Sequence, residues 1–270
     1  MRAIPIGTKF KSSAHEPDGD PIFVTALARG LSVLCCFTRS TPELSVTDIG
    51  RMTGLPQPTI WRLCHTLRRL GYLTQALEGK KLRLGIPVLG LGYALLADLD
   101  IATLARPHMQ ALADQFEESV SLATMDGADI LFLQRCETPS LIYSGFPVGA
   151  RSPITRAPAG WAMLVGMDEG KRNSVIAAIE ATDPTHWSSM RSHIDAAIIE
   201  FEEFGFVTNM GKVQSEFHAV SAPIASPDGK QMFALSCVGL RSRLPAERLY
   251  EFGPLLRECT KVIAQALRPG

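Results

Sequence analysis

The sequence contains no long hydrophobic run and has no net charge, since 27 basic residues balance 27 acidic ones. No apolar segment reaches the roughly 18 residues of a membrane-spanning helix. The first residues include Pro, Lys and Asp where a signal peptide would carry an apolar stretch. We therefore expect a cytoplasmic globular protein, and its 46% hydrophobic content is sufficient for a sizeable core.

Cysteine motifs and phosphate-binding loops are also missing. The six cysteines are scattered, with no Cys-x-x-Cys pair and no Cys/His spacing typical of a zinc site. We expect them to be free, buried thiols in a reducing compartment. The sequence has no Gly-rich loop of the kind that holds phosphates, and we expect the protein to use no cofactor and no metal.

The zero net charge hides an uneven distribution. Residues 24–85 hold nine Lys or Arg against three Asp or Glu, a net charge of +6, whereas residues 86–270 carry −6. A basic N-terminal module joined to an acidic remainder suits a part that binds nucleic acid and a part held away from it. An imbalance of this size also arises by chance, so it supports this interpretation without deciding it.

Residues 54–70 (GLPQPTIWRLCHTLRRL) predict a helix with two different faces. One face is an apolar stripe, and the opposite face carries cations, a large aromatic and no acid. The apolar stripe consists of Ile60, Leu63, Leu67 and Leu70, and the opposite face of Pro58, Trp61, Arg62, His65 and Arg69. This pattern is typical of a helix that reads duplex DNA, although a helical hairpin in any core can share it.

Two further helices are predicted before this segment. Residues 45–52 form a short one, with Ser45 as a plausible N-cap and Gly54 suited to the tight turn that follows. Residues 23–38 form the other. The residues expected to face inward are Val46, Ile49 and Met52 in the short helix, and Leu27, Leu31, Leu34 and Phe37 in the first one.

The residues after the predicted recognition helix favour a β-hairpin, with strands at 71–74 and 82–85 and a polar turn at 78–81. A helix-turn-helix followed by a hairpin with a basic tip is a winged helix, whose recognition helix lies in the major groove while the wing contacts flanking phosphates. The predicted DNA-contacting residues are Ser45, Thr47, Gln57, Thr59, Trp61, Arg62, Lys80, Lys81 and Arg83.

Residues 86–99 (IPVLGLGYALLADL) predict an apolar helix between two domains. Its stripe consists of Val88, Leu91, Leu95 and Leu99, with Leu89 and Leu96 beside it. So apolar a surface on a connecting helix needs a cover. The helix either packs on its own chain or contacts a second subunit, and we favour the second subunit.

The remainder of the chain predicts an α+β domain with a mainly antiparallel sheet flanked by helices. Strand pairs are expected at 120–125 with 130–136 and at 219–225 with 231–240, with additional strands at 142–146 and 206–208. The expected helices cover residues 107–118, 168–181, 189–204 and 245 onward. We expect Pro107 to interrupt the pattern before it, and Gly253-Pro254 to kink the last helix.

The chain resembles the IclR-type transcriptional regulators over roughly residues 23–268. The matching segments are GLPQPTIWRL from Gly54, LRLG from Leu82, ARPHM from Ala105 and AVSAPI from Ala219. The polar composition of the first residues, with several Pro and Gly, predicts a disordered tail (1–22). The resemblance implies a winged helix-turn-helix domain (23–85), a linker helix (86–100) and a GAF-like effector-binding domain (101–270). It also implies a dimer or a dimer of dimers that controls transcription from a double-stranded DNA operator in response to a small-molecule effector.

The resemblance also implies a ligand pocket. Carried over position by position, the pocket falls on Ala157, Pro158, Ala159, Asn209, Phe217, Ala219, Ser236 and Val238. The chain departs from the family pattern around it: Thr155, Arg156 and Trp161 stand where His, Ala and Lys are frequent, Asn209 where an acid is, and Ala219 where a Cys is. The identity of the effector therefore cannot be inferred from a relative, and the absence of this Cys argues against a metal in the pocket.

Arg156 is the least familiar residue of this set. In one interpretation it points to solvent or pairs with Asp129 or Glu216. In the other it binds the carboxylate of a small organic acid, since its planar guanidinium matches a carboxylate with two parallel hydrogen bonds.

An enzyme and a sensor without DNA-binding activity are the alternatives. Cys136, Cys237 and the Ser215/His218 pair are candidate nucleophiles, the last for a hydrolase, but none lies in a nucleophile elbow or a recognisable triad order. We therefore expect no catalysis. A sensor that acts by protein contact alone has no use for a basic helix face and wing, so a lack of salt-dependent duplex affinity would favour it.

Overall fold

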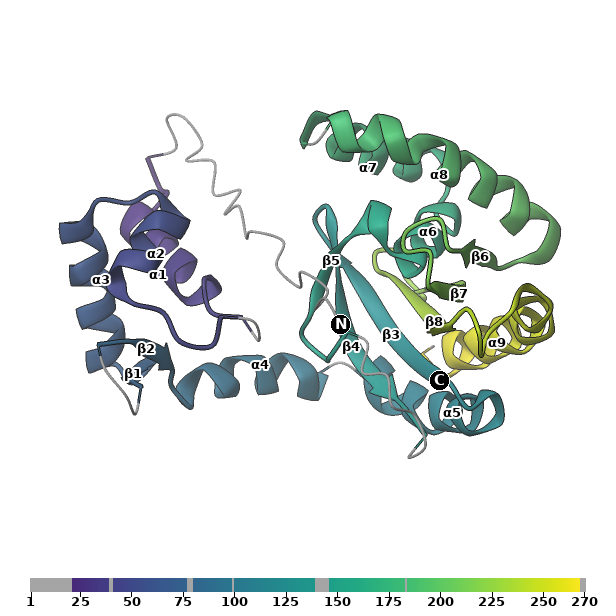
Figure 1. Ribbon diagram of the computed structural model, residues 1–270, viewed down its shortest axis with the longest axis horizontal. Helices are drawn as coiled ribbons and strands as arrows, with labels where there is room; N and C mark the ends of the chain where they lie inside the picture. Colours follow the sequence, from purple (N-terminus) through teal and green to yellow (C-terminus); the bar gives the residue numbers. More distant parts are fainter. Residues whose placement is uncertain are drawn as a thin grey trace. The chain divides into compact units, whose positions relative to one another are not determined.

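The computed structural model describes residues 21–38, 41–76, 80–98, 100–138, 146–182 and 184–267, and the chain divides into two compact units, Met1–Asp98 and Leu99–Gly270 (Figure 1). No helix within these ranges is long and apolar enough to cross a membrane. The tail expected over residues 1–22 lies outside the described residues up to position 20.

The first unit contains three helices, a two-stranded wing and one further helix, as the residue pattern predicted (Figure 1). Its elements are α1 (Thr25–Cys35), α2 (Val46–Thr53), α3 (Gln57–Arg69), β1 (Leu73–Gln75), β2 (Leu82–Leu84) and α4 (Pro87–Asp98). The two strands are antiparallel, with Leu73 opposite Leu84. The helix-turn-helix and the hairpin are therefore confirmed.

Local sequence determines both ends of α2. Ser45 Oγ accepts a hydrogen bond from the Asp48 backbone N–H (3.1 Å), and the Asp48 carboxylate accepts one from the Ser45 N–H (3.1 Å), which together form a capping box. The bond from the Ser45 hydroxyl, and after it the one from the Ser45 N–H, lowers the pKa of Asp48. The helix ends at Gly54, whose φ of 71° favours glycine.

Fewer residues are buried in the core of the first unit than the predicted apolar stripes contain. Val33, Ile49 and Ile60 are fully buried, and Leu73 and Leu82 of the wing pack with them. Four residues expected to face inward are instead exposed, namely Leu27, Leu31, Met52 and Leu70. Burial along α1 begins only at Val33, because the rest of the unit covers only the C-terminal part of that helix.

The wing is fixed to the rest of the unit at two places. Leu44, just before α2, forms an isolated antiparallel bridge with Leu82, with backbone N···O distances of 3.0 and 2.8 Å. At the base of the wing, Gly85 lies so close to Gly71 that an added Cβ would be 1.9 Å from the Gly71 carbonyl oxygen. The Gly85 N–H also donates to the Tyr72 carbonyl (2.9 Å).

The second unit is built around a six-stranded antiparallel sheet with the strand order β5-β4-β3-β8-β7-β6. The strands are β3 (Ser119–Asp126), β4 (Asp129–Cys136), β5 (Arg151–Pro153), β6 (Val207–Met210), β7 (Phe217–Ala225) and β8 (Met232–Leu240). The two predicted hairpins are β3–β4 and β7–β8, and pairing of β3 with β8 joins them into one sheet.

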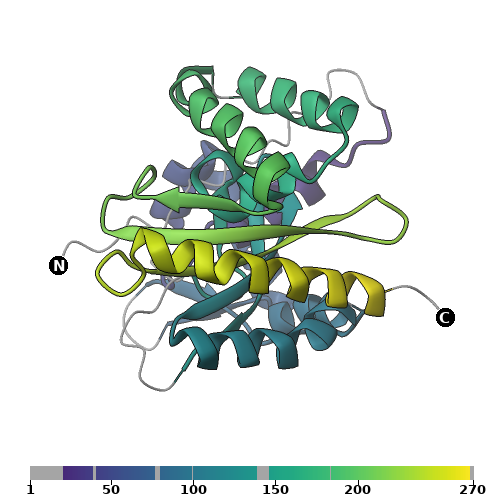
Figure 2. The same ribbon diagram turned by 90° about the vertical axis from the view of Figure 1, so that its right-hand side faces the viewer.

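Helices cover both faces of this sheet (Figures 1 and 2). On one face lie α5 (Asp100–Phe116) and α9 (Ala246–Ala266), and on the other η1 (Ile154–Arg156), α6 (Pro158–Val165), α7 (Glu169–Thr182) and α8 (Pro184–Phe204). Alternating strand residues divide the core accordingly. Leu122, Val220 and Leu235 pack under α5 and α9, whereas Ala123 and Ala234 pack under α6.

Several predicted elements need correction. Helix α5 begins at Asp100 and continues through Pro107, because buried residues on both sides of the proline, Ala105 and Met109, hold the helix to the core. Helix α6 was not predicted, since every residue after Pro158 is buried and the segment therefore lacks an amphipathic period.

The end strand of the sheet also differs from the prediction. It is β5, at residues 151–153, whereas residues 142–145 of the strand expected at 142–146 lie outside the described part of the chain. At the C-terminus, α9 runs through Gly253 and Pro254 as one continuous helix. Gly253 leaves room there for the Phe206 ring, which would lie 2.3 Å from an added Cβ.

Packing of α6 on η1 yields a testable prediction. An added Cβ at Gly160 would lie 2.2 Å from the Ile154 carbonyl oxygen, a backbone atom that cannot move aside, so Gly160→Ala should lower the free energy of unfolding by about 1–3 kcal/mol. The matched control is Gly170→Ala in α7, where the nearest atom is 3.5 Å away and alanine should be neutral or stabilising. Urea denaturation measures both, and equal stability of the two variants would contradict the predicted clash.

Candidate functional site

Helix α3 has the two faces that its sequence predicted. Ile60 and Cys64 are buried against α1 and α2, whereas Trp61, Arg62 and His65 are exposed. The Trp61 and His65 rings stack with their centroids 5.5 Å apart, and 62% of Trp61 is accessible to solvent. The exposed face is therefore an aromatic and cationic surface.

The cations of this surface are not neutralised by the part of the unit that the structure describes. Among the described residues, none of the α3 arginines forms an ion pair with a carboxylate; Arg68 donates to the Gln75 amide oxygen in β1 (3.4 Å). The only acid on α2, Asp48, is engaged by Ser45 and Arg51. Positive charge on α3 thus remains available to a polyanion.

The residues predicted to contact DNA fall into three groups. Gln57, Trp61 and Arg62 are exposed on α3, and Thr59 is half-buried. Thr47, Lys80, Lys81 and Arg83 are exposed on α2 and the wing. Ser45 is half-buried and its hydroxyl is used by the capping box, in which it also donates to the Asp48 carboxylate (2.6 Å). The Ser45 hydroxyl is therefore not free to bind a phosphate, and Ser45 can contribute only through its position at the start of α2.

In the second unit, polar side chains form a row across the sheet face that lies under α6. Arg135 on β4 is opposite Ser121 on β3, which is opposite Ser236 on β8, which is opposite Ser221 on β7. Residues directly opposite each other in a sheet point to the same face. The three serines are almost completely buried, and the Ser221 and Ser236 hydroxyls are 2.7 Å apart. We call these four residues the polar row.

The next row along the strands contains much of the predicted pocket. It runs from Ser119 through Val238 and Ala219 to Asn209. Ala219 and Asn209 are buried, and Val238 is half-buried. Asn209 Oδ1 accepts a hydrogen bond from the Lys212 backbone N–H (2.9 Å), and Ser119 donates to the Val238 carbonyl (3.1 Å). The strand register therefore brings these predicted residues together beside the polar row.

Helix α6 and η1 cover this face of the sheet. Trp161, fully buried, donates from its indole nitrogen to the Thr155 carbonyl (2.8 Å), and its ring lies 5.9 Å from that of His193 on α8. His193 Nδ1 is buried without a hydrogen-bond partner among the described residues, and burial lowers the pKa of His193.

The remaining predicted pocket residues lie in η1 and α6, which cover this face of the sheet, or at the edge of the face. Ala157 and Ala159 are buried at the start of α6, Pro158 and Phe217 are half-buried, and Arg156 is exposed at the end of η1. Asp129, considered as a partner for Arg156, lies 3.9 Å from Arg151.

Arg135, Ser121 and Ser221 are functional candidates that the sequence did not reveal. Ser121 and Ser221 lie in strands whose alternation is visible in the sequence, but the residue opposite each depends on pairing between distant segments. A register shift between Leu122 and Ala123 also changes which β4 residue meets β3. Only the folded sheet therefore brings the cation and the hydroxyl groups together.

The candidate nucleophiles are not activated. Burial raises the pKa of both the Cys136 and Cys237 thiols, which disfavours the reactive thiolate. His218 is buried with Nδ1 2.9 Å from the Leu244 carbonyl oxygen, whereas Ser215 is exposed, and no hydrogen bond joins the two residues. Within the described ranges, no group of three His, Cys, Asp or Glu side chains is arranged to hold a metal.

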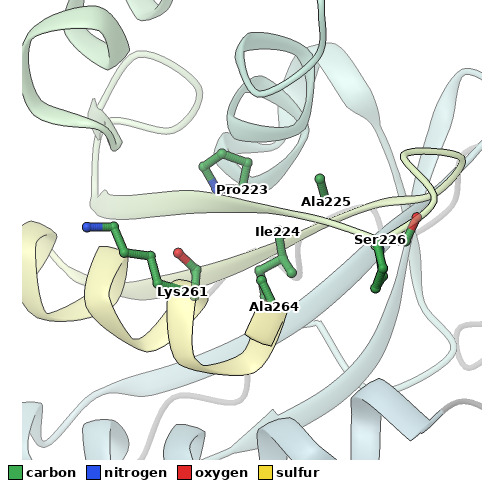
Figure 3. Close-up of a pocket in the computed structure, with 8 residues that line it drawn as sticks. Pro223, Ile224, Ala225, Ser226, Lys261 and Ala264 are labelled. Carbon is green, nitrogen blue, oxygen red and sulfur yellow. The ribbon is translucent and has the colours of Figure 1, made fainter. Parts of the chain in front are cut away.

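Two surface pockets lie away from the centre of this face. One, of about 280 Å³, lies between the end of β7 and α9 and is bordered by Ile224, Ser226, Lys261 and Ala264 (Figure 3). Lys261 there already pairs with Glu258 (2.7 Å). The other, of about 330 Å³, lies beside the C-terminal end of β4, where Arg135 and Glu137 border it.

Comparisons with known proteins agree with this architecture. The family model for the IclR helix-turn-helix domain matches residues 26–76, and that for the bacterial transcriptional regulator IclR C-terminal domain matches residues 93–265. Over 248 residues the chain is 29% identical to the HTH-type transcriptional regulator TsaQ1/TsaQ2 of Comamonas testosteroni, which covers 91% of this chain and 89% of that protein.

Solved structures share the fold. An IclR family transcriptional regulator from Brucella abortus is 35% identical, with a TM-score of 0.82 and coverage of 93% of this chain and 95% of that one. An IclR homolog from Microbacterium hydrocarbonoxydans, crystallised with 4-hydroxybenzoate, is 24% identical, with a TM-score of 0.72 and coverage of 90% and 99%.

The buried serine pair gives a prediction about stability. Replacing Ser221 or Ser236 by Ala leaves the other hydroxyl buried without its partner and should cost about 1–3 kcal/mol of unfolding free energy, whereas the double replacement should cost less than the sum of the two. Chemical denaturation of the four proteins measures this coupling. Strictly additive effects would show that the two hydroxyls do not depend on each other.

Proposed function

The chain belongs to the IclR family of bacterial transcriptional regulators, and on that basis we propose that it acts in the cytoplasm as a homodimer whose affinity for operator DNA is set by a small organic acid. The observation that carries the proposal is the exposed, unneutralised cationic face of α3 in a winged helix, joined in one chain to a sheet that carries a buried polar row.

DNA binding follows from the geometry of the first unit. Helix α3 fits the major groove, where Gln57, Thr59, Trp61 and Arg62 reach base edges or adjacent phosphates. Thr47, the start of α2 at Ser45, and the wing residues Lys80, Lys81 and Arg83 contact the backbone. This arrangement separates residues that determine sequence preference from residues that supply affinity for any duplex.

The effector site is proposed on the sheet face under α6, at Ala157, Pro158, Ala159, Asn209, Phe217, Ala219, Ser236 and Val238, with Arg156 at its margin. The relative that was crystallised with 4-hydroxybenzoate supports an organic acid as the class of ligand. Acid binding and DNA binding are coupled reciprocally, so the acid changes operator affinity by the factor by which DNA changes acid affinity. The site works without a metal, and the protein catalyses no reaction.

The homodimer is proposed from apolar surface in the first unit. On α1, Leu27 and Leu31 are exposed, and at the start of α4 so are Leu89 and Leu91, the latter at 57%. Exposed leucines of this kind favour a protein contact, and a second copy of the chain supplies a matching surface. The side chains of Leu95, Leu96 and Leu99, which the sequence places on the same helix, lie outside the described residues.

DNA recognition is tested by two substitutions with different expected effects. Arg62→Ala should weaken operator binding by roughly ten- to a hundredfold and relax the preference at one base position, because a bidentate contact to guanine contributes about 1–3 kcal/mol of discrimination. Lys81→Ala should weaken binding to all sequences alike and reduce the salt dependence. Gel shifts on DNA upstream of the gene and its neighbours, at several salt concentrations, measure both. Wild-type binding by Arg62→Ala would show that α3 is docked differently.

Assembly is tested by placing a charge on α4. Leu91→Glu should shift the protein toward monomer in analytical ultracentrifugation, since a carboxylate in a dry interface costs several kcal/mol. Operator binding should fall with it, because two half-sites require two linked winged helices. The matched control is Ile199→Glu on α8, where the side chain is 67% exposed and no partner is proposed. A Leu91→Glu protein that remains dimeric would place the interface elsewhere.

A further inference from the structure

The polar row holds more hydrogen-bond donors than acceptors. In the Ser221–Ser236 pair one hydroxyl donates to the other, which leaves the second proton without an acceptor in the described part of the chain. The Ser121 hydroxyl accepts from Arg135 Nη1 at 3.5 Å, and no described acceptor takes its own proton. Buried donors without acceptors are costly, so the row is incomplete without a group that accepts hydrogen bonds.

The guanidinium of Arg135 is the strongest of these donors and is only partly engaged. Its Nε pairs with the Glu137 carboxylate, and Nη1 makes two long contacts of 3.5 Å, to Ser121 Oγ and to the Phe146 carbonyl oxygen. Its Nη2 is buried and has no partner among the residues that the structure describes. The Arg135 side chain as a whole is only 11% exposed. A buried cation favours binding of an anion when one of its nitrogens makes only long hydrogen bonds and another has no hydrogen-bond partner.

We propose that Arg135 binds the carboxylate of the effector through Nη1 and Nη2, and that Ser121 donates to the same carboxylate. This inference rests on the proposed function, because it assigns the residue that determines which organic acids the protein senses. The outer edge of a guanidinium matches a carboxylate with two parallel bonds, and a carboxylate has enough lone pairs to accept the Ser121 proton as well.

The rest of the acid is defined by the neighbouring rows. Because Arg135 Nη1 contacts Ser121 on β3, the spare hydroxyl of the Ser221–Ser236 pair lies one or two strands from the guanidinium, roughly 5–10 Å at about 4.8 Å per strand, so it suits a second oxygen of a small molecule. On one side of the polar row lie Phe132, Ala123 and Ala234, an apolar surface. The expected ligand is a flat monocarboxylic acid with a hydroxyl or carbonyl group opposite its carboxylate.

The surface pocket beside Arg135, and the comparison with Arg156, also favour Arg135 as the residue that binds the carboxylate. Arg135 borders the 330 Å³ surface pocket beside the C-terminal end of β4, and this pocket supplies a route by which an anion reaches the guanidinium. Arg156, by contrast, is exposed, and solvent screens an exposed ion pair. Burial gives Arg135 the stronger electrostatic interaction with an anion.

The test uses the full-length protein and isothermal titration calorimetry. The probes are the three hydroxybenzoates and pyruvate, each compared with its neutral amide. Wild type should bind at least one acid and discriminate against its amide by tenfold or more. Arg135→Met should weaken that acid by roughly ten- to a hundredfold and remove the preference for acid over amide, because the charge-assisted bonds are lost. Arg191→Met is the matched control, because Arg191 is an exposed arginine on α8 outside the proposed site, and it should bind the acid within about twofold of wild type.

Two further variants keep the test decisive if Arg135→Met proves unstable by circular dichroism. Arg135→Lys retains the charge but not the two parallel bonds, and should lose about tenfold in affinity. Glu137→Gln removes the carboxylate that competes for Arg135 and should bind the acid several-fold more tightly, a gain that a purely structural role of Arg135 does not predict.

Operator binding separates failure of this inference from failure of the proposed function. Arg135 lies in the second unit, so unliganded Arg135→Met should bind operator DNA like wild type. Normal DNA binding combined with wild-type acid affinity in Arg135→Met would overturn the role of Arg135 alone. If no acid of the panel binds wild type below about 1 mM, both the role of Arg135 and the organic acid as effector are overturned, while DNA binding stands. If wild type itself fails to bind operator DNA, the proposed function is overturned instead.

Discussion

Pairing between β3 and β8 joins two hairpins that are far apart in the chain, with Ser119 opposite Val238, 119 residues later. Because side chains alternate between the faces of a sheet, this register directs Val120 and Leu122 toward α5 and α9, and Ser121 toward α6. A slip of one residue would exchange the two faces and bury the serines in the larger core. The stability of the domain and the chemistry of its polar row therefore depend on the same set of backbone hydrogen bonds.

Much of the first unit could be predicted from the sequence because its signals are local. Ser45 and Asp48 are three residues apart and cap α2 themselves, and Gly54 ends it with a positive φ. The errors have a physical cause: periodicity shows which residues share a stripe, but not whether another element covers that stripe. Leu27 and Leu31 share their stripe with Leu34, which packs on the core, yet both are exposed in the single chain.

The candidate ligand site could be predicted only in part. Resemblance placed Asn209, Ala219 and Ser236 on one face, which the strand register brings together. The same reasoning drew attention to Arg156, because it stands in a recognisable motif, and overlooked Arg135, whose surroundings are created by pairing between β4, β3, β8 and β7. A buried guanidinium nitrogen without a hydrogen-bond partner is a property of tertiary structure, and no local sequence pattern predicts it.

The bridge between Leu44 and Leu82, together with the close contact of Gly85 with Gly71, has a consequence for how such a protein diversifies. Strand β2 is held at Leu82 to Leu44, two residues before α2, by backbone bonds, and such bonds tolerate almost any side chain. Substitutions on the outer face of α3 and at the wing tip thus leave this frame unchanged. Operator preference and general duplex affinity can accordingly drift independently in descendants of one gene, while the frame between them is inherited intact.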